Sequence, residues 1–570
     1  MESTRHASRV TFCFALLLAA GAALGDVTSG SRLELWVDET WPAPSPGGYF
    51  PVRISVRNSG PERSLRIEVQ AAYSELTAGA IGRSFAVGEG QTANFALPVP
   101  LIEPYGSYVL NVYEDGRQIE GLTQHVRLNC STSDGRSLLI ISERNEDLRA
   151  LDEALMDASG RTSSPRLTRI EPTQLREGWV SYTGLGLIGI SARAVEMLSP
   201  ALREDLRKWV ATGGTLFVYR EIAPGSDPVA LLLNETPAPK ARPDLTPHYF
   251  GRVRWFKNDP FQGEKAYWTW LLGEAIGHPG TAFNARFGFQ GRGGPFMSVP
   301  GVGAVPVRAY GLMVALFALA IGPVNYFVLR RKKKLHLLFV TTPALALAMT
   351  AAMVAYGILS EGLGVKATMA SLTWLDQDRH EAVTLGRMAF YAGMGIRGGL
   401  WFPRDIAAFP AAGDMTSGSL DTTEGLRFRG GWVRPRAMLN YVTAGVAPAR
   451  GRLQVKRAGA ALQVTNGLGV GIRQIYLMDA RKTLYKAAGI ADGAAGTTFT
   501  PPPDKPDTAF GLDRTTGIHL LRRADLEPGT FLAELEGSAY FVSGLRRFTE
   551  YGGRHLLFGR FSEEGDGHSD

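Results

Sequence analysis

The side chains best arranged for chemistry lie in the segment DQDRH, where Asp376, Asp378 and His380 occupy alternate positions. Carboxylate oxygens and an imidazole nitrogen are common metal ligands, so these side chains form a candidate metal site. The segment also separates two runs of alternating residues, LTWL and AVTLGRMAFY. The sequence favours the polar turn of a β-hairpin, which explains the same residues without a metal.

A second candidate is the glycine pattern Gly184, Gly186 and Gly189, which matches the dinucleotide-binding motif G-x-G-x-x-G. That motif works as a loop that follows a strand and opens a helix, whose N-terminus then binds pyrophosphate. Here the glycines lie inside the apolar run GLGLIGI, and the next clear helix begins only at Ser199. The pattern therefore favours a close-packed strand over a nucleotide site.

Nucleophiles are scarce in this chain. Of its two cysteines, Cys13 lies in an N-terminal apolar segment and Cys130 stands alone, so no internal disulfide is expected in the mature protein. The patterns G-x-S-x-G, H-E-x-x-H, Walker A and C-x-x-C are all missing from the sequence. We predict no catalytic residue, no cofactor and no bound metal.

The candidate residues above are part of a chain that contains two long apolar segments. Residues 309–329 and 337–360 contain 21 and 24 residues without a charge. As helices they reach ~31 Å and ~36 Å, enough to cross a hydrocarbon core of about 30 Å. The short loop 330–336 between them predicts a helical hairpin. Its topology determinants are five consecutive cations, Arg330, Arg331, Lys332, Lys333 and Lys334.

Several residues interrupt these apolar helices. Gly322, Pro323 and Asn325 lie in the first and Pro343 in the second. Proline removes a backbone donor and kinks a helix, and an asparagine can form a hydrogen bond across a helix pair. The sequence favours packing of the helix hairpin by these four residues; a polar path for a substrate is the alternative.

Residues 1–25 have the order of an export signal. Arg5 and Arg9 precede the apolar residues 10–20, and the small residues Ala23 and Gly25 come just before Asp26. Export, combined with a cationic loop that stays in the cytoplasm, places both flanking regions outside. We predict a bacterial cytoplasmic (inner) membrane protein with both large domains on the periplasmic or extracytoplasmic side.

Most of the positive net charge lies in the loop between the two apolar segments and in the N-terminal segment. The formal charge is +7, of which the loop cations contribute five and the N-terminal segment one. The exported parts are then almost neutral, which argues against nucleic acid as a partner. The predicted partners are the membrane and other envelope proteins; the oligomeric state is left open.

Hydrophobic patterning divides the exported parts into three regions. Residues 26–130 show short alternating runs with turn signals, typical of an immunoglobulin-like β-sandwich. Residues 131–300 alternate apolar strands with helices, which predicts a doubly wound α/β domain. Residues 361–561 predict an all-β region, and residues 562–570 a disordered acidic tail.

Two passages resemble known families. The passage YTGLGLIGIS…LSPALREDLRKWVATGGTLFVY is similar to class I glutamine amidotransferase-like domains. The hairpin, above all GPVNYFVLRR at residues 322–331, resembles a family of uncharacterised bacterial envelope membrane proteins. That family combines an immunoglobulin-like module, a noncatalytic amidotransferase-like domain, a two-helix transmembrane hairpin and a β-rich tail.

The resemblance to amidotransferase domains raises the question of whether this chain could hydrolyse glutamine. Glutamine hydrolysis needs a cysteine at a strand-to-helix elbow, together with a histidine and a carboxylate. Cys130 precedes the first strand of the α/β region, so the resemblance implies a noncatalytic domain.

Three functions are compatible with this organisation. The leading hypothesis is a noncatalytic, membrane-anchored envelope protein that presents binding or scaffold domains. The alternatives are an envelope glycan- or peptide-processing enzyme and an accessory subunit of a transport complex. Two helices alone cannot enclose a conventional transport pathway, so the last alternative requires a partner or oligomerisation.

Overall fold

A computed structural model describes most of the chain. The described residues are 27–30, 32–43, 48–71, 79–100, 105–129, 137–159, 167–223, 226–236, 245–276, 297–302, 307–410, 418–459, 461–498 and 526–564. The predicted signal peptide at residues 1–25, Cys130 and residues 565–570 of the predicted tail lie outside them.

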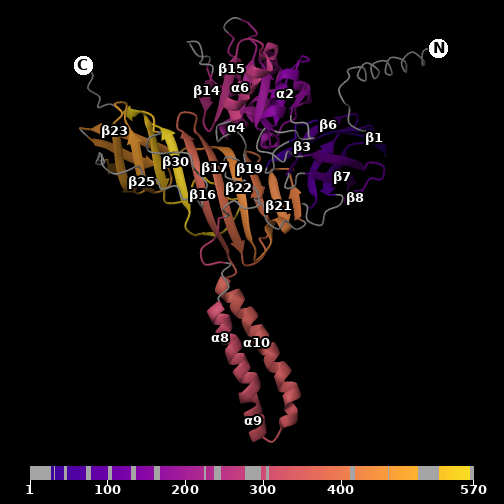
Figure 1. Ribbon diagram of the computed structural model, residues 1–570, viewed down its shortest axis with the longest axis vertical. Helices are drawn as coiled ribbons and strands as arrows, with labels where there is room; N and C mark the ends of the chain where they lie inside the picture. The colour runs from indigo at the N-terminus through magenta and orange to yellow at the C-terminus, as the bar shows by residue number, and fades with distance from the viewer. Residues whose placement is uncertain are drawn as a thin grey trace, which may run out of the picture.

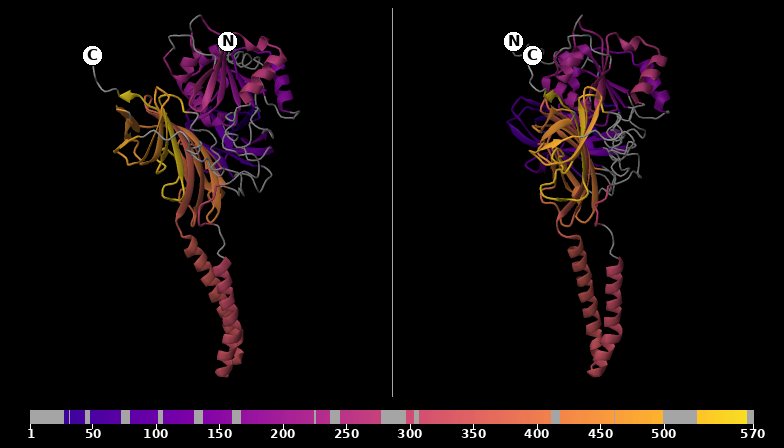
Figure 2. Two further views of the ribbon diagram at one scale, coloured as in Figure 1. Left: turned by 60° about the vertical axis from the view of Figure 1, so that its left-hand side comes forward. Right: turned by 90° about the vertical axis from the view of Figure 1, so that its left-hand side faces the viewer.

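The protein is a mostly β multi-sheet body from which a helical hairpin extends as a stalk (Figure 1). The α/β sheet lies at the end opposite the stalk, and the other sheets lie between them (Figure 2). Short 3-10 helices connect several elements: η1 (Pro172–Gln174), η2 (Trp179–Tyr182), η3 (Pro260–Gln262), η6 (Leu335–Leu337) and η7 (Gly431–Val433).

Two antiparallel sheets form the N-terminal sandwich. The first contains β1 (Val27–Gly30), β2 (Leu33–Asp38), β3 (Tyr49–Asn58) and β6 (Thr92–Pro100). The second contains β4 (Arg63–Ala71), β5 (Ile81–Val87), β7 (Tyr105–Glu114), β8 (Arg117–Gln118) and β9 (Gln124–Asn129). Alternate residues of β2 are buried, as the period of two predicts for a strand with one buried face.

The second sheet continues into chain that follows the hairpin. Strand β20 (Gly418–Asp421) pairs in parallel with β5, and β21 (Leu426–Gly430) and β18 (Leu400–Phe402) extend the sheet further. Arg66 of β4 also forms an ion pair with Asp421 at 2.8 Å. The sequence predicts residues 26–130 as a separate module, whereas the structure shares one of its sheets with the C-terminal region. Pairing covers the backbone groups that β5 would otherwise expose as an edge strand.

The α/β part has a six-stranded sheet in the order β11-β10-β12-β13-β15-β14. Its strands are β10 (Leu138–Ile141), β11 (Leu167–Ile170), β12 (Leu187–Ser191), β13 (Thr215–Tyr219), β14 (Leu245–His248) and β15 (Gly251–Phe256). All neighbours are parallel except β14, which pairs antiparallel with β15. The predicted parallel sheet is thus present with one antiparallel edge strand.

Helices cover both faces of this sheet, as its continuously apolar strands require. Leu138 and Ile140 pack with helices α2 (Arg149–Ser159) and α6 (Lys265–Ile276). Their neighbours Leu139 and Ile141 face the core that contains α3 (Ala192–Met197), α4 (Pro200–Ala211) and α5 (Pro228–Leu233). Helix α4 begins as predicted, because the Ser199 hydroxyl accepts the Leu202 N–H at 3.2 Å.

Two further sheets make up the rest of the C-terminal region. The larger has nine strands: β16 (Val365–Asp376), β17 (Glu381–Ala392), β19 (Ile406–Pro410), β22 (Met438–Pro448), β25 (Ile472–Met478), β26 (Leu484–Ile490), β28 (Thr530–Leu535), β29 (Thr549–Glu550) and β30 (Arg554–Arg560). The smaller contains β23 (Arg452–Ala458), β24 (Ala461–Gly467), β27 (Ala495–Thr497) and β31 (Glu563–Glu564). Strand β31 lies where the sequence predicts the start of a disordered tail, because its backbone pairs with the edge of β23.

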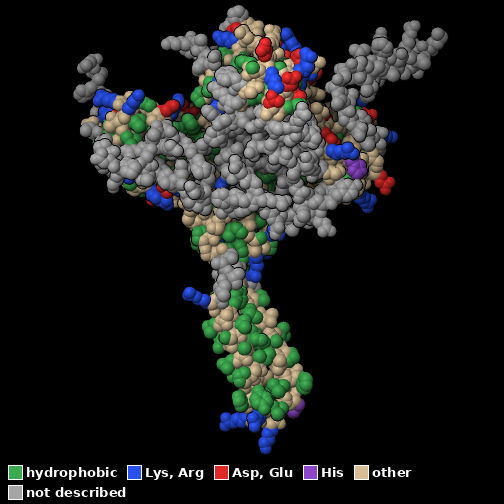
Figure 3. All heavy atoms as spheres, viewed as in Figure 1, with side chains coloured by type: hydrophobic (Ala, Val, Ile, Leu, Met, Phe, Trp, Pro, Cys, Tyr) green, Lys and Arg blue, Asp and Glu red, His purple; other side chains and the backbone are tan. Residues whose placement is uncertain are grey.

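The stalk consists of two helices long and apolar enough to cross a membrane, Arg308–Arg331 and Leu335–Gly357. Its elements are α8 (Val307–Leu319), a π-helical turn (Ala320–Val324), α9 (Asn325–Arg331) and α10 (Leu338–Glu361). Their hydrophobic side chains face outward along the stalk, and Lys and Arg side chains gather at its tip (Figure 3). An outward apolar surface is unfavourable in water and suits lipid.

The chain before the stalk and the chain after it form one body. A single core contains Val52 of the sandwich, Leu206 of α4 and Phe390 of β17. Arg207 of α4, only 4% exposed, also forms an ion pair with Glu381 of β17 at 2.6 Å. If the stalk spans a membrane, these contacts require both flanking regions to lie on the same side of it.

Candidate functional site

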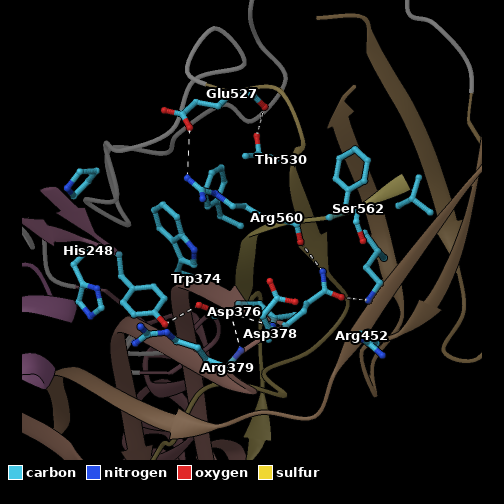
Figure 4. Close-up of a pocket in the computed structure, with 18 of the residues that line it drawn as sticks. His248, Trp374, Asp376, Asp378, Arg379, Arg452, Glu527, Thr530, Arg560 and Ser562 are labelled. Atoms are coloured by element: carbon cyan, nitrogen blue, oxygen red, sulfur yellow. Dashed lines mark hydrogen bonds and ion pairs between the residues drawn. The ribbon is translucent and has the colours of Figure 1, made fainter. Parts of the chain in front are cut away.

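A groove lies between the α/β sheet and the two C-terminal sheets, with a volume of about 690 Å³ (Figure 4). We call it the β16–β23 groove. Its lining comes from the turn after β16, the β14–β15 turn, the start of β23 and the end of β30. A concave site of this size, with apolar and polar walls, is typical of small-ligand sites.

The turn after β16 carries the predicted DQDRH residues. Strands β16 and β17 pair antiparallel along their whole length, which confirms the predicted hairpin. One carboxylate oxygen of Asp376 accepts the backbone N–H groups of Asp378 at 3.0 Å and Arg379 at 2.9 Å. Asp376 therefore shapes the turn, and His380 ends it with a left-handed φ of 54°.

Asp376 also ties this turn to the α/β part. Its second carboxylate oxygen accepts the hydroxyl hydrogen of Tyr249 at 2.9 Å. Tyr249 lies in the β14–β15 turn, where its φ is 51°. Burial raises the pKa of the Tyr249 phenol, and the negative charge of Asp376 raises it further, so the phenol stays a donor.

Arg379 makes a second connection to the α/β part. Its guanidinium donates to the carbonyl oxygen of Leu233 at 3.2 Å and lies 3.4 Å from the Glu235 carboxylate. The same carboxylate lies 3.7 Å from Nδ1 of His248. The groove wall is thus fixed by contacts of the turn after β16 with two segments of the α/β part, the β14–β15 turn and the end of α5.

Aromatic rings and one amide form the floor. The rings of Trp374 and Phe558 meet edge to face, with centroids 4.5 Å apart. The amide of Gln377 donates to the Arg560 carbonyl oxygen at 2.6 Å and accepts the Leu453 N–H at 2.8 Å. Gln377 therefore joins β30 to β23, and the two rings add an apolar surface to the groove lining.

Charged side chains line the rim (Figure 4). Arg560 and Glu527 form a loose ion pair at 3.9 Å, and both are more than 70% exposed. Among the described residues, the side chains of Asp378 and Arg452 have no hydrogen bond or ion pair. An exposed surface pair contributes little to stability, so these four side chains are available to a ligand.

The groove is better suited to binding than to metal chemistry. The described residues contain no group of three or more His, Cys, Asp and Glu side chains placed to hold a metal. Asp376 is occupied by the turn and by Tyr249, and His380 is exposed at the end of the turn. The structure thus does not bring the three predicted metal-ligand candidates together on one ion.

Sequence reasoning found the turn but missed most of the groove. Tyr249, Trp374 and Arg452 come from three separate segments, and no spacing rule links them. One signal was present, because an aromatic residue near the end of the strand that leads into a polar turn places a ring close to charged side chains.

Of the glycine pattern, Gly189 lies in a strand. Gly189 is in the middle of β12, and an added Cβ atom would lie 2.3 Å from the Phe217 ring. Gly184 and Gly186 come just before that strand. The interpretation as a close-packed strand is confirmed for Gly189, whereas Gly184 and Gly186 belong to the turn that leads into the strand.

The carboxyl ends of the parallel strands carry a polar cluster of their own. The Glu146 carboxylate, 3% exposed, accepts hydrogen bonds from Arg220 at 2.7 Å and from the hydroxyl of Ser142 at 2.6 Å. Arg220 directly follows β13 with a φ of 66° and also reaches Asp259 at 2.7 Å. The Arg220 guanidinium is thus paired with the carboxylates of Glu146 and Asp259, and these ion pairs hold the segments at the carboxyl end of the sheet together.

The four residues predicted to pack the helix hairpin differ in their exposure. Asn325 is 8% exposed, and its amide donates to the Thr341 hydroxyl of the other helix at 3.0 Å. Gly322, Pro323 and Pro343 are exposed on the outer surface of the helices, which differs from the predicted packing role. Pro323 lies within the π-helical turn, where the helix accommodates its missing N–H.

The predicted topology determinants lie together at the tip of the stalk. Arg330 and Arg331 end α9, and the following lysines form the turn, in which Lys333 has a φ of 53°. All five side chains are exposed (Figure 3).

Comparisons with known proteins give no family assignment. No protein-family model and no curated protein matches the chain. Among solved structures, a Paenibacillus cycloisomaltooligosaccharide glucanotransferase matches with a TM-score of 0.16 and 13% identity, over 34% of this chain and 27% of that enzyme. The yeast delta-COP-I mu-homology domain matches with a TM-score of 0.16 and 10% identity, over 35% of this chain and 96% of that domain.

A third solved structure is a calcium-binding mutant of Bacteroides uniformis β-glucuronidase 2. It matches with a TM-score of 0.13 and 9% identity, over 94% of this chain and 61% of that enzyme. The chain spans about a quarter of the length of the first of these three proteins. At these TM-scores, the similarities carry no argument about fold or function.

Proposed function

We propose that this protein is a noncatalytic, membrane-anchored envelope protein that binds a polar ligand in the β16–β23 groove. The ligand class is a fragment of an envelope polymer, an oligosaccharide or a short peptide. The observation that carries the proposal is the groove itself, with aromatic rings on its floor and the charged side chains of Asp378 and Arg452 on its rim.

The chemistry of the lining supports this ligand class. The Trp374 ring offers an apolar face to a sugar ring or a peptide side chain. Asp378 can accept hydrogen bonds from hydroxyl or amide groups, and Arg452 can donate them. A wall held by Tyr249 and Arg379 is preorganised, which lowers the entropy cost of binding.

The membrane assignment is part of the same proposal. A cationic loop at the tip of the stalk supports a cytoplasmic location for that tip, in the bacterial inner membrane. The contacts between the two flanking regions support one extracytoplasmic body. The assignment of residues 131–300 as amidotransferase-like is also a proposal, supported by the strand order β11-β10-β12-β13-β15, which is that of flavodoxin-like sheets.

Binding to fragments of enzymatically digested cell-wall material tests the proposal. The full-length protein in detergent is titrated separately with sugar fragments and with peptide fragments, and calorimetry measures affinity. The double variant D378N/R452Q removes both rim charges and keeps the side-chain sizes similar. We expect its affinity to fall at least about tenfold, since hydrogen bonds to charged groups contribute about 1.5–3 kcal/mol each.

The variant D115N/R481Q is a matched control, because Asp115 and Arg481 are exposed turn residues outside the groove. Equal affinity for D378N/R452Q and the control would reject the groove as the binding site. Release of cleaved fragments by the wild type would instead support a processing enzyme, and mass spectrometry of the titrated mixture detects them.

A further inference from the structure

The stalk defines the level at which the membrane surface must lie. The rings of Tyr310 and Tyr356 meet edge to face at the ectodomain end of the hairpin, with centroids 5.9 Å apart. Tyrosine is enriched at the level of the lipid headgroups. Helix α10 ends at Glu361, and β16 begins at Val365 only a few residues later. The adjoining end of the ectodomain therefore lies close to the headgroups, with the start of β16 within ~20 Å of Tyr356.

This end of the ectodomain is built from four adjacent segments, which we call the basal surface: residues 362–366, 393–399, 434–438 and 543–551. The Gly393 N–H donates to the Gly364 carbonyl oxygen at 3.1 Å, and the Arg436 N–H donates to that of Ala392 at 2.8 Å. Thr549 pairs with Lys366, which brings the fourth segment beside the start of β16.

Apolar side chains are exposed on the basal surface. Leu363 is 54% exposed, Met394 56% and Tyr551 37%. Hydrophobic side chains are also visible on the end of the body that faces the stalk (Figure 3). In water such exposure costs free energy, whereas at a bilayer surface the same side chains insert between headgroups.

Cations surround these apolar residues. The four segments contain six Lys and Arg residues and one carboxylate, Glu550. That carboxylate is occupied by Nε2 of His555 at 2.7 Å. Four exposed arginines carry most of the positive charge: Arg397, Arg436, Arg546 and Arg547. The basal surface is thus strongly positive, although the exported body as a whole is almost neutral.

We infer that the basal surface docks on anionic phospholipid headgroups of the leaflet from which the stalk emerges. The inference requires that the stalk spans the membrane and is independent of any ligand in the groove. Arginine suits phosphate through paired hydrogen bonds, and each cation near an anionic surface contributes about fivefold to the binding equilibrium. The exposed Leu363 and Met394 add apolar contact.

Docking would hold the groove at a fixed height. Strand β16 runs from the basal surface at Val365 to Asp376 in the groove. Twelve residues of strand span up to ~40 Å, so a docked body presents the groove at most about that far above the headgroups. An undocked body would tilt on its short connections to the stalk.

Hydrogen exchange of the full-length protein in nanodiscs tests the docking. One set of discs contains only phosphatidylcholine, and the other also contains phosphatidylglycerol. We expect slower amide exchange in residues 393–399 and 543–548 in the anionic discs, with the difference reduced by high salt. In the variant R397Q/R436Q/R546Q/R547Q the docking equilibrium constant should fall about fivefold for each arginine, so the difference between discs disappears.

The control variant R144Q/R193Q/R481Q/K482Q removes four exposed cations outside the basal surface and should keep the protection. Unchanged circular dichroism of both variants verifies that they fold. Equal exchange in the two kinds of disc would overturn the inference. Protection that appears only when other envelope proteins are added would overturn it too, in favour of a protein partner.

Discussion

The ion pair between Arg207 and Glu381 gives the sharpest test of the single body, because it joins chain before the stalk to chain after it. The Arg207 guanidinium is 4% exposed and donates to Glu381 at 2.6 and 2.9 Å and to Glu204 at 2.7 Å. Burial alone would lower the pKa of Arg207, but the hydrogen bonds to the two carboxylates raise it above its ordinary value.

The substitution Glu381→Gln keeps the shape of the side chain and removes its charge. Breaking a buried pair costs about 3–5 kcal/mol when it leaves an unpaired charge. Glu204 still pairs with Arg207 in this variant, and Glu381 is 21% exposed, so the loss is smaller. We expect the free energy of unfolding to fall by about 2–3 kcal/mol.

Denaturant unfolding of the detergent-solubilised full chain, followed by tryptophan fluorescence and by limited proteolysis, measures this change. The control is Glu196→Gln, which breaks an equally short pair of 2.7 Å with Arg193 on an exposed helix surface and should cost under about 1 kcal/mol. Because the buried pair joins both flanking regions, their proteolytic protection should be lost together. Equal effects of the two substitutions, or separate loss of protection, would refute the single body.

Three other predictions concern separate features. Burial raises the pKa of the Asp205 carboxyl to about 6, so the folded protein binds this proton more tightly than the unfolded chain does. The free energy of unfolding, measured with denaturant at several pH values, should therefore rise as the pH falls from about 7 to about 4. The substitution D205N should flatten that rise. G189A should destabilise by about 1–3 kcal/mol or more in denaturant unfolding, whereas G395A, with open space around the new methyl group, should change little. N325L should weaken the helix hairpin by about 0.6–1.7 kcal/mol in detergent unfolding, and adding T341V to it should cost little more, because both remove one hydrogen bond.

Local signals predicted much of the fold. The β16–β17 hairpin follows from two alternating runs around a polar turn, and helix α4 follows from Ser199, Pro200 and the apolar spacing after them. The buried strand at Gly189 follows from its apolar neighbours. Each of these elements is specified within about a dozen residues, so reading them requires no knowledge of distant contacts.

The candidate site could be predicted only in part. The sequence pointed to Asp376 and Asp378, because their spacing is visible in one segment. It gave no sign that Tyr249 binds Asp376 or that Arg452 lies across the groove, since these contacts join strands of different sheets. Of the residues expected to pack the hairpin, Asn325 contacts the other helix, while the exposure of Pro343 depends on how the helices rotate against each other.

By itself, the sequence determined the apolar hairpin, its cationic tip and the β or α/β character of each region that flanks the hairpin, because composition and periodicity act within a segment. Only the tertiary structure decided that these regions form one body. Strand β5 would be left as an edge, and β20 from beyond the hairpin pairs with it, so the two parts of the chain share a sheet. The same joining creates the groove, because its walls come from segments that meet only when the sheets pack.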